Sequence, residues 1–196
     1  MAKTIEFWFD FGSNYSYIAA ERIESLAAPR GFTVQWRPFL LGPIFKSFGW
    51  DSSPFVLQKQ KGQYVWLDMQ RQCRKYGIPW NKPSAFPRAA VYPMRIAAAN
   101  AGAPWLPEFC QRIFRANFVE DRDINSNELS AAVLDAIGVP GQAIVAAAQQ
   151  EPAKSMLREQ SERAVQLGIF GAPTFFVGGE MYWGNDRLED ALSQAA

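Results

Sequence analysis

Residues 5–17, IEFWFDFGSNYSY, change from a strand pattern to the start of a helix within one short turn. Residues 5–9 are apolar and mostly aromatic, which predicts a buried β-strand. Residues 10–12, Asp-Phe-Gly, interrupt that run, and the Ser13 hydroxyl can then cap a helix that continues to about residue 28. Apolar side chains recur along this helix at spacings of three and four residues, which indicates one buried face.

Strand patterns recur near the two ends of the chain, and a long helical stretch separates them. Residues 32–39 alternate apolar and polar side chains, as a second strand does. A long helical stretch follows, which includes an Ala-rich helix at residues 87–100 with a kink at Pro93. A hairpin closed by two glycines and a short final helix come last. We therefore expect an α/β fold, with a thioredoxin-like domain split between residues 1–40 and 168–196 and a large all-helical insertion domain at residues 41–167.

The composition excludes several classes of function. Twenty basic and nineteen acidic residues give a net charge of +1, which favours neither a nucleic acid nor an anionic membrane as partner. The absence of histidine excludes a His-based triad and a His-ligated zinc site. Cys73 and Cys110 form no CxxC pair, so we expect two small buried side chains and no metal site. No signal peptide or membrane span is recognisable, which predicts a cytoplasmic protein.

Ser13 is the first candidate for chemistry. Where a thioredoxin-like fold carries a CxxC pair, this sequence has Ser13 and Ser16, and serines cannot exchange electrons. A helix N-terminus with a hydroxyl can instead stabilise an external anion or thiolate. The alternative is that Ser13 only caps its helix.

Two further candidate segments lie near the C-terminus. Pro173 precedes an apolar strand, where a cis peptide bond would turn the backbone of the preceding residue toward the helix N-terminus; the alternative is an ordinary loop proline. Asn185 and Asp186 precede the last helix and could simply cap it. In the functional interpretation, Asp186 binds the amine of a peptide-like ligand and nearby backbone amides bind its carboxylate.

Three stretches together resemble one family, the 2-hydroxychromene-2-carboxylate isomerases, which are related to kappa-class glutathione transferases. They are DFGSNYSY (10–17), RPFLLGPIFK (37–46) and FGAPTFFVGGEMYWGNDRLEDAL (170–192). The similarity covers nearly the whole chain, and the Trp-Gly-Asn-Asp-Arg string after Gly-Ala-Pro-Thr is its most specific part. The chain departs from the pattern at Asn14, where the family has proline, and at Trp50, where kappa-class enzymes have an asparagine that contacts glutathione.

The resemblance implies a glutathione cofactor and assigns roles to eight residues. Ser13 is the catalytic residue beside the glutathione sulfur, and Ala172 pairs its backbone with the cysteinyl part. The γ-glutamyl end is held by Trp183, Gly184, Asn185 and Asp186. The substrate contacts are Lys46, beside the substrate carboxylate, and the aromatic Phe86. For Lys46 the alternative is a solvated surface lysine.

The resemblance also implies a reaction, the glutathione-dependent interconversion of 2-hydroxychromene-2-carboxylate and trans-o-hydroxybenzylidenepyruvate. This cis–trans isomerisation belongs to the breakdown of naphthalene, an aromatic hydrocarbon, and the family resemblance indicates a homodimer. Two alternatives stay open at this stage. One is a kappa-class-like glutathione transferase that acts on other electrophiles, and the other is a non-catalytic thioredoxin-like binding module.

Overall fold

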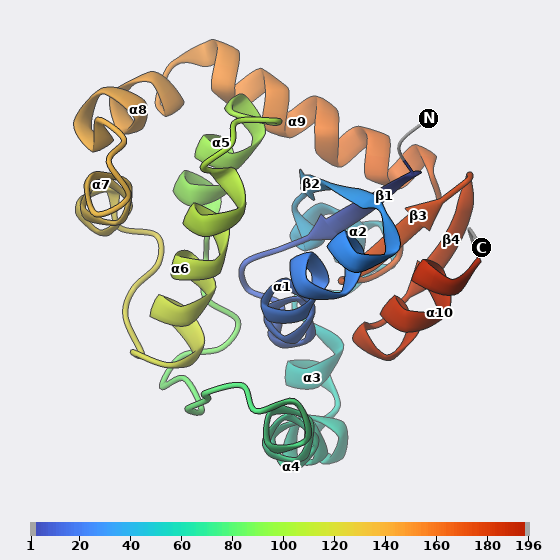
Figure 1. The fold of residues 1–196 in the computed structure, drawn as a ribbon. Coiled ribbons are helices and arrows are strands. Elements are labelled where there is room, and N and C mark those ends of the chain that lie inside the picture. The colour runs from blue at the N-terminus through green and yellow to red at the C-terminus, as the bar shows by residue number, and fades with distance from the viewer. Residues whose placement is uncertain (1–2, 195–196) are drawn as a thin grey trace.

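Four strands form one mixed sheet in the computed structural model, which describes residues 3–194 (Figure 1). The strands lie in the order β2-β1-β3-β4. β1 pairs parallel with β2 and antiparallel with β3, and β4 closes the hairpin with β3. Their bounds are β1 (Lys3–Phe9), β2 (Phe32–Pro38), β3 (Thr174–Val177) and β4 (Glu180–Trp183). The α/β class and the thioredoxin-like sheet predicted from the sequence are confirmed.

Helix α1 (Asn14–Ala27) connects β1 to β2. Residues 16–20 are buried without interruption, so the helix is enclosed by the core on more sides than the one face that the apolar spacing predicts. Ser13 is its N-cap residue, with extended backbone and a hydroxyl oxygen that accepts a hydrogen bond from the Ser16 amide at 3.2 Å. The helix ends in a short 3-10 turn, η1 (Ala28–Arg30), before β2. The predicted strand–turn–helix at the start of the chain is therefore confirmed in type and closely in its bounds.

Eight helices separate β2 from β3, as the helical pattern of this stretch predicts (Figure 1). They are α2 (Leu41–Ser47), α3 (Pro54–Leu57), α4 (Lys59–Tyr76), α5 (Val91–Ala99), α6 (Leu106–Phe118), α7 (Asn127–Asp135), α8 (Gly141–Ala148) and α9 (Glu151–Gln166). After the hairpin, η2 (Asn185–Arg187) and α10 (Leu188–Ser193) complete the described chain. The division into a split domain and an insertion domain stays a prediction, and one hydrophobic cluster draws residues from both parts.

The helix predicted from residue 87 begins later than expected. α5 starts at Val91, and the peptide bond between Phe86 and Pro87 is cis. Pro93 therefore lies in the first turn of α5, where its missing amide hydrogen would have no helical partner in any case. The predicted kink at Pro93 is wrong for this reason, and the residues before Val91 form a loop.

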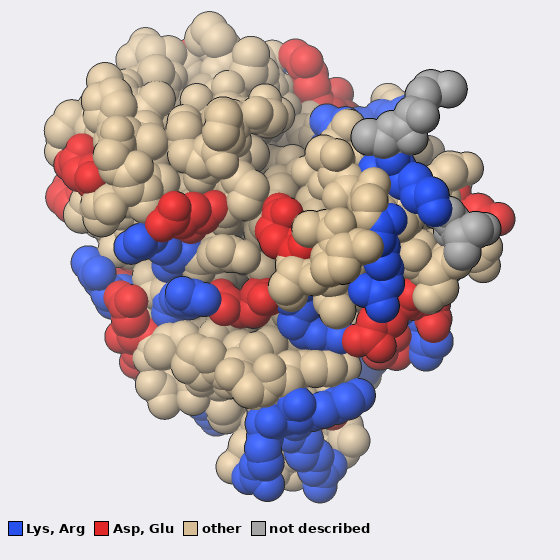
Figure 2. All heavy atoms as spheres, viewed as in Figure 1, with Lys and Arg blue, Asp and Glu red and all other residues tan. Residues whose placement is uncertain are grey.

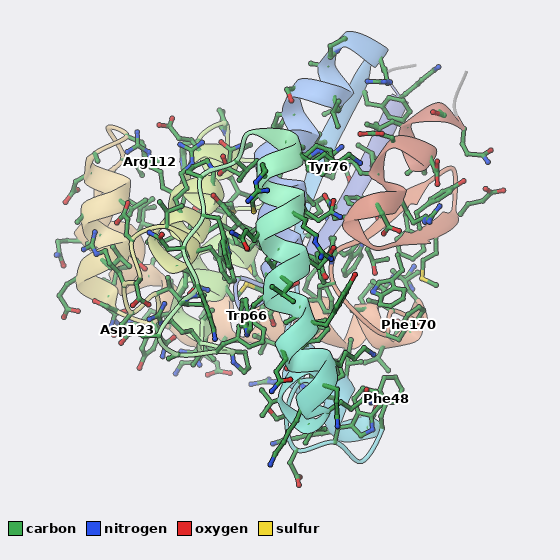
Figure 3. The ribbon with its side chains drawn as sticks, turned by 90° about the horizontal axis from the view of Figure 1, so that it is seen from below. Phe48, Trp66, Tyr76, Arg112, Asp123 and Phe170 are labelled. Atoms are coloured by element: carbon green, nitrogen blue, oxygen red, sulfur yellow. The ribbon has the colours of Figure 1, made fainter. Side chains whose placement is uncertain are left out.

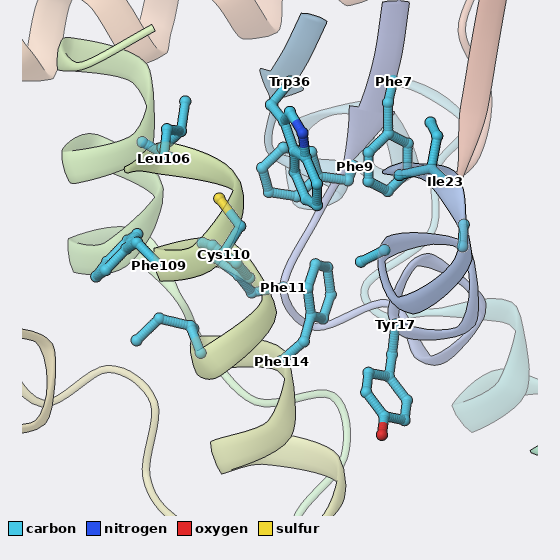
Figure 4. Close-up of a cluster of buried hydrophobic side chains, with 14 of the residues drawn as sticks. Phe7, Phe9, Phe11, Tyr17, Ile23, Trp36, Leu106, Phe109, Cys110 and Phe114 are labelled. Atoms are coloured by element: carbon cyan, nitrogen blue, oxygen red, sulfur yellow. The ribbon is translucent and has the colours of Figure 1, made fainter. Parts of the chain in front are cut away.

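Aromatic side chains join the sheet to the helical part (Figure 4). Phe114 of α6 is fully buried, and its ring centroid lies 4.9 Å from Phe11, 5.8 Å from Phe9 and 6.3 Å from Tyr17. Phe11 itself belongs to the turn between β1 and α1. Packing of α6 therefore fixes the position of the turn that carries Ser13.

We expect Phe114→Ala to lower the free energy of unfolding by about 3–5 kcal/mol, because it leaves a cavity among fully buried rings. Urea denaturation followed by circular dichroism measures this change. Phe48→Ala is the matched control, since that ring is 49% exposed, and a surface truncation should cost less than about 0.5 kcal/mol. Equal costs for the two variants would contradict the assigned core.

Candidate functional site

The Ser13 hydroxyl bridges the two ends of the chain. Its Oγ donates a hydrogen bond to the Ala172 carbonyl oxygen at 2.9 Å, across 159 residues of sequence. The peptide bond between Ala172 and Pro173 is cis, so the predicted cis proline is confirmed. Ser13 is 7% exposed and also caps α1. The helix N-terminus, the hydroxyl and the cis-proline backbone therefore form one small polar site.

Asp10 holds the turn that presents Ser13. Its two carboxylate oxygens accept hydrogen bonds from the Gly12 amide at 2.7 Å and the Leu41 amide at 2.9 Å. Its carbonyl oxygen accepts a third from the Ser13 amide at 2.9 Å. Burial raises the pKa of Asp10 above its ordinary value of 3.8, and the two backbone donors oppose that shift. One buried side chain thus ties the end of β1 to the first residue of α2.

The loop that carries Phe86 lies against the same turn. A Cβ placed on Gly12 would come within 3.0 Å of the Arg88 carbonyl oxygen and 3.7 Å of Pro87 Cβ, so only glycine fits there without displacement. Phe86 is half-buried, and its ring meets Trp66 of α4 edge-on at 4.7 Å. The structure therefore brings the Phe86 loop to the Ser13 turn, although the sequence separates them by about seventy residues.

Lys46 lies apart from these contacts. It stands in the last turn of α2 and is exposed, and its side chain makes no hydrogen bond or ion pair among residues 3–194, although its carbonyl oxygen accepts from the Gly49 amide at 2.9 Å. Trp50 follows as a partly exposed ring packed edge-on against Phe48 at 5.6 Å (Phe48 is labelled in Figure 3). The bond from the Leu41 amide to Asp10 fixes the N-terminus of α2, the helix that carries Lys46. Lys46 itself does not contact Ser13.

The segment from Trp183 to Asp186 adjoins the cis proline. The Gly184 amide donates to the Pro173 carbonyl oxygen at 2.9 Å, and Gly184 has a φ of 109°, which favours glycine. The Trp183 ring is 52% exposed and packs on Phe170 at 4.8 Å. The Asp186 side chain is 71% exposed and pairs with its neighbour Arg187 at 3.1 Å. The segment therefore presents one aromatic ring and one carboxylate beside the cis-proline backbone.

The alternative that Asn185 or Asp186 caps the last helix is wrong. The N-cap residue of α10 is Arg187, which makes no side-chain capping bond, and Gly184 occupies that position for η2. Asn185 is instead 5% exposed, and its side-chain oxygen accepts a hydrogen bond from Arg22 at 3.0 Å. Neither Asn185 nor Asp186 therefore caps α10.

A tyrosine–aspartate pair begins two residues after the cap. The Tyr15 hydroxyl donates to Asp68 Oδ2 of α4 at 2.6 Å. Burial raises the pKa of Tyr15, and the hydrogen bond to Asp68 and the negative charges of Asp68 and Asp186 add to that rise. Tyr15 therefore stays protonated and fixes α4 against the start of α1.

The sequence analysis did not find Asp10, Arg22 or the Tyr15–Asp68 pair. Asp10 had one visible signal, since it is an acidic residue at the end of an apolar strand and two residues before a glycine. Arg22 and Asp68 look like ordinary charged positions on helices, and their partners come from distant segments. The prediction that both cysteines are small buried side chains is confirmed, and burial raises the pKa of Cys73 to about 12.

The surface charge is mixed, with one local excess. Figure 2 shows Lys and Arg side chains gathered at the lower end of the molecule, where α4 lies in Figure 1. α4 carries Lys59 and Lys61 in its first turn and Arg71, Arg74 and Lys75 in its last two turns. Within residues 3–194, no group of three or more Cys, Asp or Glu side chains is arranged to hold a metal ion. Over the same range, no helix has the length and apolar character needed to cross a membrane.

Comparison with known proteins agrees with this fold. The profile described as "DSBA-like thioredoxin domain" matches residues 4–196. The curated 2-hydroxychromene-2-carboxylate isomerase of Sphingobium xenophagum is 31% identical, over 96% of each chain, and that of Pseudomonas putida is 30% identical, over 94% of this chain and 90% of that protein. A solved structure of a 2-hydroxychromene-2-carboxylate isomerase superposes with a TM-score of 0.88 at 28% identity, covering 98% of this chain and 95% of the other.

The buried Asp10 carboxylate predicts a pH dependence of stability. Because its folded-state pKa is raised, the folded protein holds a proton that the unfolded chain releases at about pH 4. The contribution of Asp10 to the free energy of unfolding is therefore present at low pH. It is lost as the pH rises through the pKa that Asp10 has in the folded protein. Urea titrations of the wild type and Asp10→Asn should show the wild type losing stability relative to the variant as the pH rises from 4. Parallel pH profiles would contradict this assignment.

Proposed function

We propose that this chain, which belongs to the DSBA-like thioredoxin domain family and within it to the 2-hydroxychromene-2-carboxylate isomerases, is a glutathione-dependent isomerase. Its proposed reaction interconverts 2-hydroxychromene-2-carboxylate and trans-o-hydroxybenzylidenepyruvate in the breakdown of naphthalene. The proposal includes a homodimer, which rests on the family resemblance, and a cytoplasmic location, which rests on the sequence pattern.

The observation that carries the proposal is the Ser13 hydroxyl at the N-terminus of α1, opposite the backbone before the cis proline. Ser13 cannot exchange disulfides, but it can donate a hydrogen bond to a sulfur anion held at this place. The donors present also fit a peptide ligand. Ala172 is half-buried, and its amide donates no hydrogen bond within residues 3–194. The exposed carboxylate of Asp186 suits an ammonium group.

When bound, glutathione supplies a thiolate that adds to the conjugated double bond and leaves again, which allows rotation about that bond. The role of the protein is to favour the thiolate over the thiol. A free cysteine thiol has a pKa of about 8.5, and lowering it by two units takes roughly 2.7 kcal/mol. The Ser13 hydroxyl turns its proton from the Ala172 carbonyl oxygen to the sulfur, and the positive end of α1 adds to the stabilisation.

We assign the substrate contacts to Phe86 and Lys46. Phe86 supplies an apolar ring on the loop above Gly12, next to the Ser13 turn. Lys46 is an exposed cation on a helix whose first residue is bound to Asp10, and it has no competing carboxylate partner among residues 3–194. An aromatic substrate with one carboxylate matches these two groups.

The second candidate function is a glutathione transferase. It is favoured by a relative named "Glutathione S-transferase kappa 1" from Caenorhabditis elegans, which is 25% identical over 97% of this chain and 91% of that protein. A transferase would consume glutathione and release a thioether, whereas the isomerase returns glutathione unchanged. The amount of free thiol before and after the reaction therefore distinguishes the two functions.

The direct test is the ultraviolet absorbance of 2-hydroxychromene-2-carboxylate mixed with the purified protein, with and without glutathione. We expect conversion to the open-chain pyruvate only when glutathione is present, with no loss of free thiol. Loss of thiol in step with substrate would support the transferase. An unchanged spectrum with glutathione present would contradict the isomerase.

We expect Ser13→Ala to reduce turnover far more than stability. Loss of the capping hydroxyl should lower the free energy of unfolding by about 1 kcal/mol, whereas loss of a hydrogen bond to the thiolate should reduce turnover by roughly tenfold or more. Ser126→Ala is the matched control, because Ser126 caps α7 in the same way, accepting from the Leu129 amide at 3.1 Å. It should cost similar stability with turnover unchanged. A Ser13→Ala enzyme with wild-type turnover would remove Ser13 from the mechanism.

A further inference from the structure

Arg22 lies buried in the middle of α1, where its guanidinium joins three other elements. Its side chain is 9% exposed. Nη1 donates to Asn185 Oδ1 of η2 at 3.0 Å, and Nη2 pairs with Glu189 of α10. The guanidinium also lies 3.6 Å from the ring centroid of Tyr76, the last residue of α4, which Figure 3 labels. A buried charge with this many partners is fixed in one position.

This contact decides how the Asn185 side chain is oriented. A guanidinium has only donor groups, so the oxygen of the carboxamide must face Arg22 and the nitrogen must face the other way. Asn185 Nδ2 therefore keeps two donor hydrogens, and no hydrogen bond from it is found among residues 3–194. Asn185 is 5% exposed, so these donors lie in a mostly dry environment, where they favour an anionic acceptor.

The neighbours of Asn185 belong to the glutathione site. On one side, the Gly184 amide is bound to the Pro173 carbonyl oxygen, which fixes the segment beside the cis proline. On the other side is the carboxylate of Asp186, which is 71% exposed and pairs with Arg187 at 3.1 Å. An amide donor and a carboxylate side by side match a carboxylate and an ammonium on one carbon atom, as in an α-amino acid group.

We propose that Arg22 is a positioning residue for the γ-glutamyl end of glutathione. It acts through Asn185, whose amide hydrogens it turns toward the γ-glutamyl α-carboxylate while Asp186 receives the ammonium group. This inference rests on the proposed glutathione function and adds a residue one step removed from the ligand. It makes glutathione affinity depend on a buried side chain of α1 that does not touch the cofactor.

Calorimetric titration of Arg22→Met with glutathione tests the proposal, and cysteinylglycine, which lacks the γ-glutamyl group, is the comparison ligand. We expect the dissociation constant for glutathione to rise roughly tenfold, as for loss of one oriented hydrogen bond, and that for cysteinylglycine to stay the same. Asn185→Asp serves as the second variant. It keeps the acceptor for Arg22, and so the fold, but replaces the donors with a charge that repels the ligand carboxylate, so it should weaken glutathione binding alone.

A double-mutant cycle separates positioning from a general loss of structure. If Arg22 acts through Asn185, adding Arg22→Met to Asn185→Ala should leave the glutathione dissociation constant of the single Asn185→Ala variant unchanged. Glu21→Gln is the matched control. It stands next to Arg22 in α1 and breaks a different ion pair, to Arg115 of α6 at 2.6 Å, so it should lower stability without changing glutathione affinity.

The outcomes separate the positioning role of Arg22 from the glutathione function on which that role rests. If the wild type binds glutathione and Arg22→Met binds it equally well, the positioning role is wrong and the glutathione function stands. Equal weakening for glutathione and cysteinylglycine, or additive effects in the cycle, would also overturn the positioning role. A wild type that does not bind glutathione would overturn both this inference and the function beneath it.

Discussion

The hydrogen bond from Ser13 Oγ to the Ala172 carbonyl oxygen is the contact on which the rest of the site depends. It forms because β1 and β3 are neighbours in the sheet, so that the turn after β1 and the cis proline before β3 lie at the same edge. The same hydroxyl caps α1, which places the positive end of the helix there as well. A sulfur anion at this point would meet a hydroxyl donor, a helix N-terminus and a half-buried peptide backbone.

Three of the helices between β2 and β3 contact the residues around Ser13. Phe114 of α6 packs on Phe11 in the Ser13 turn. The Leu41 amide at the start of α2 donates to Asp10, and Asp68 of α4 accepts from Tyr15. Each contact joins the helical part to the first seventeen residues. The helical part thus does more than enlarge the molecule, because it restricts the movement of the turn that presents Ser13.

Local signals were enough to predict the strand, turn and helix at residues 5–28 and the Ser13 cap, and they made a cis Pro173 one of two interpretations. These depend on neighbouring residues, such as an apolar run broken by Asp-Phe-Gly. The loop at residues 86–90, with the cis bond before Pro87, lies against Gly12, which is far away in sequence, and no local pattern predicted this loop or the later start of α5. Arg22 is similar, since a basic residue on a helix gives no sign that Asn185, Glu189 and Tyr76 will enclose it.

The central claim is that the N-terminus of α1 and the Ser13 hydroxyl stabilise a bound thiolate. The most direct measurement is a pH titration of the ultraviolet thiolate absorbance of glutathione bound to the protein, with free glutathione as reference. The account predicts that the bound thiol ionises about two pH units below its ordinary pKa of about 8.5. A bound thiol that titrates at the same pH as the free one would contradict the account.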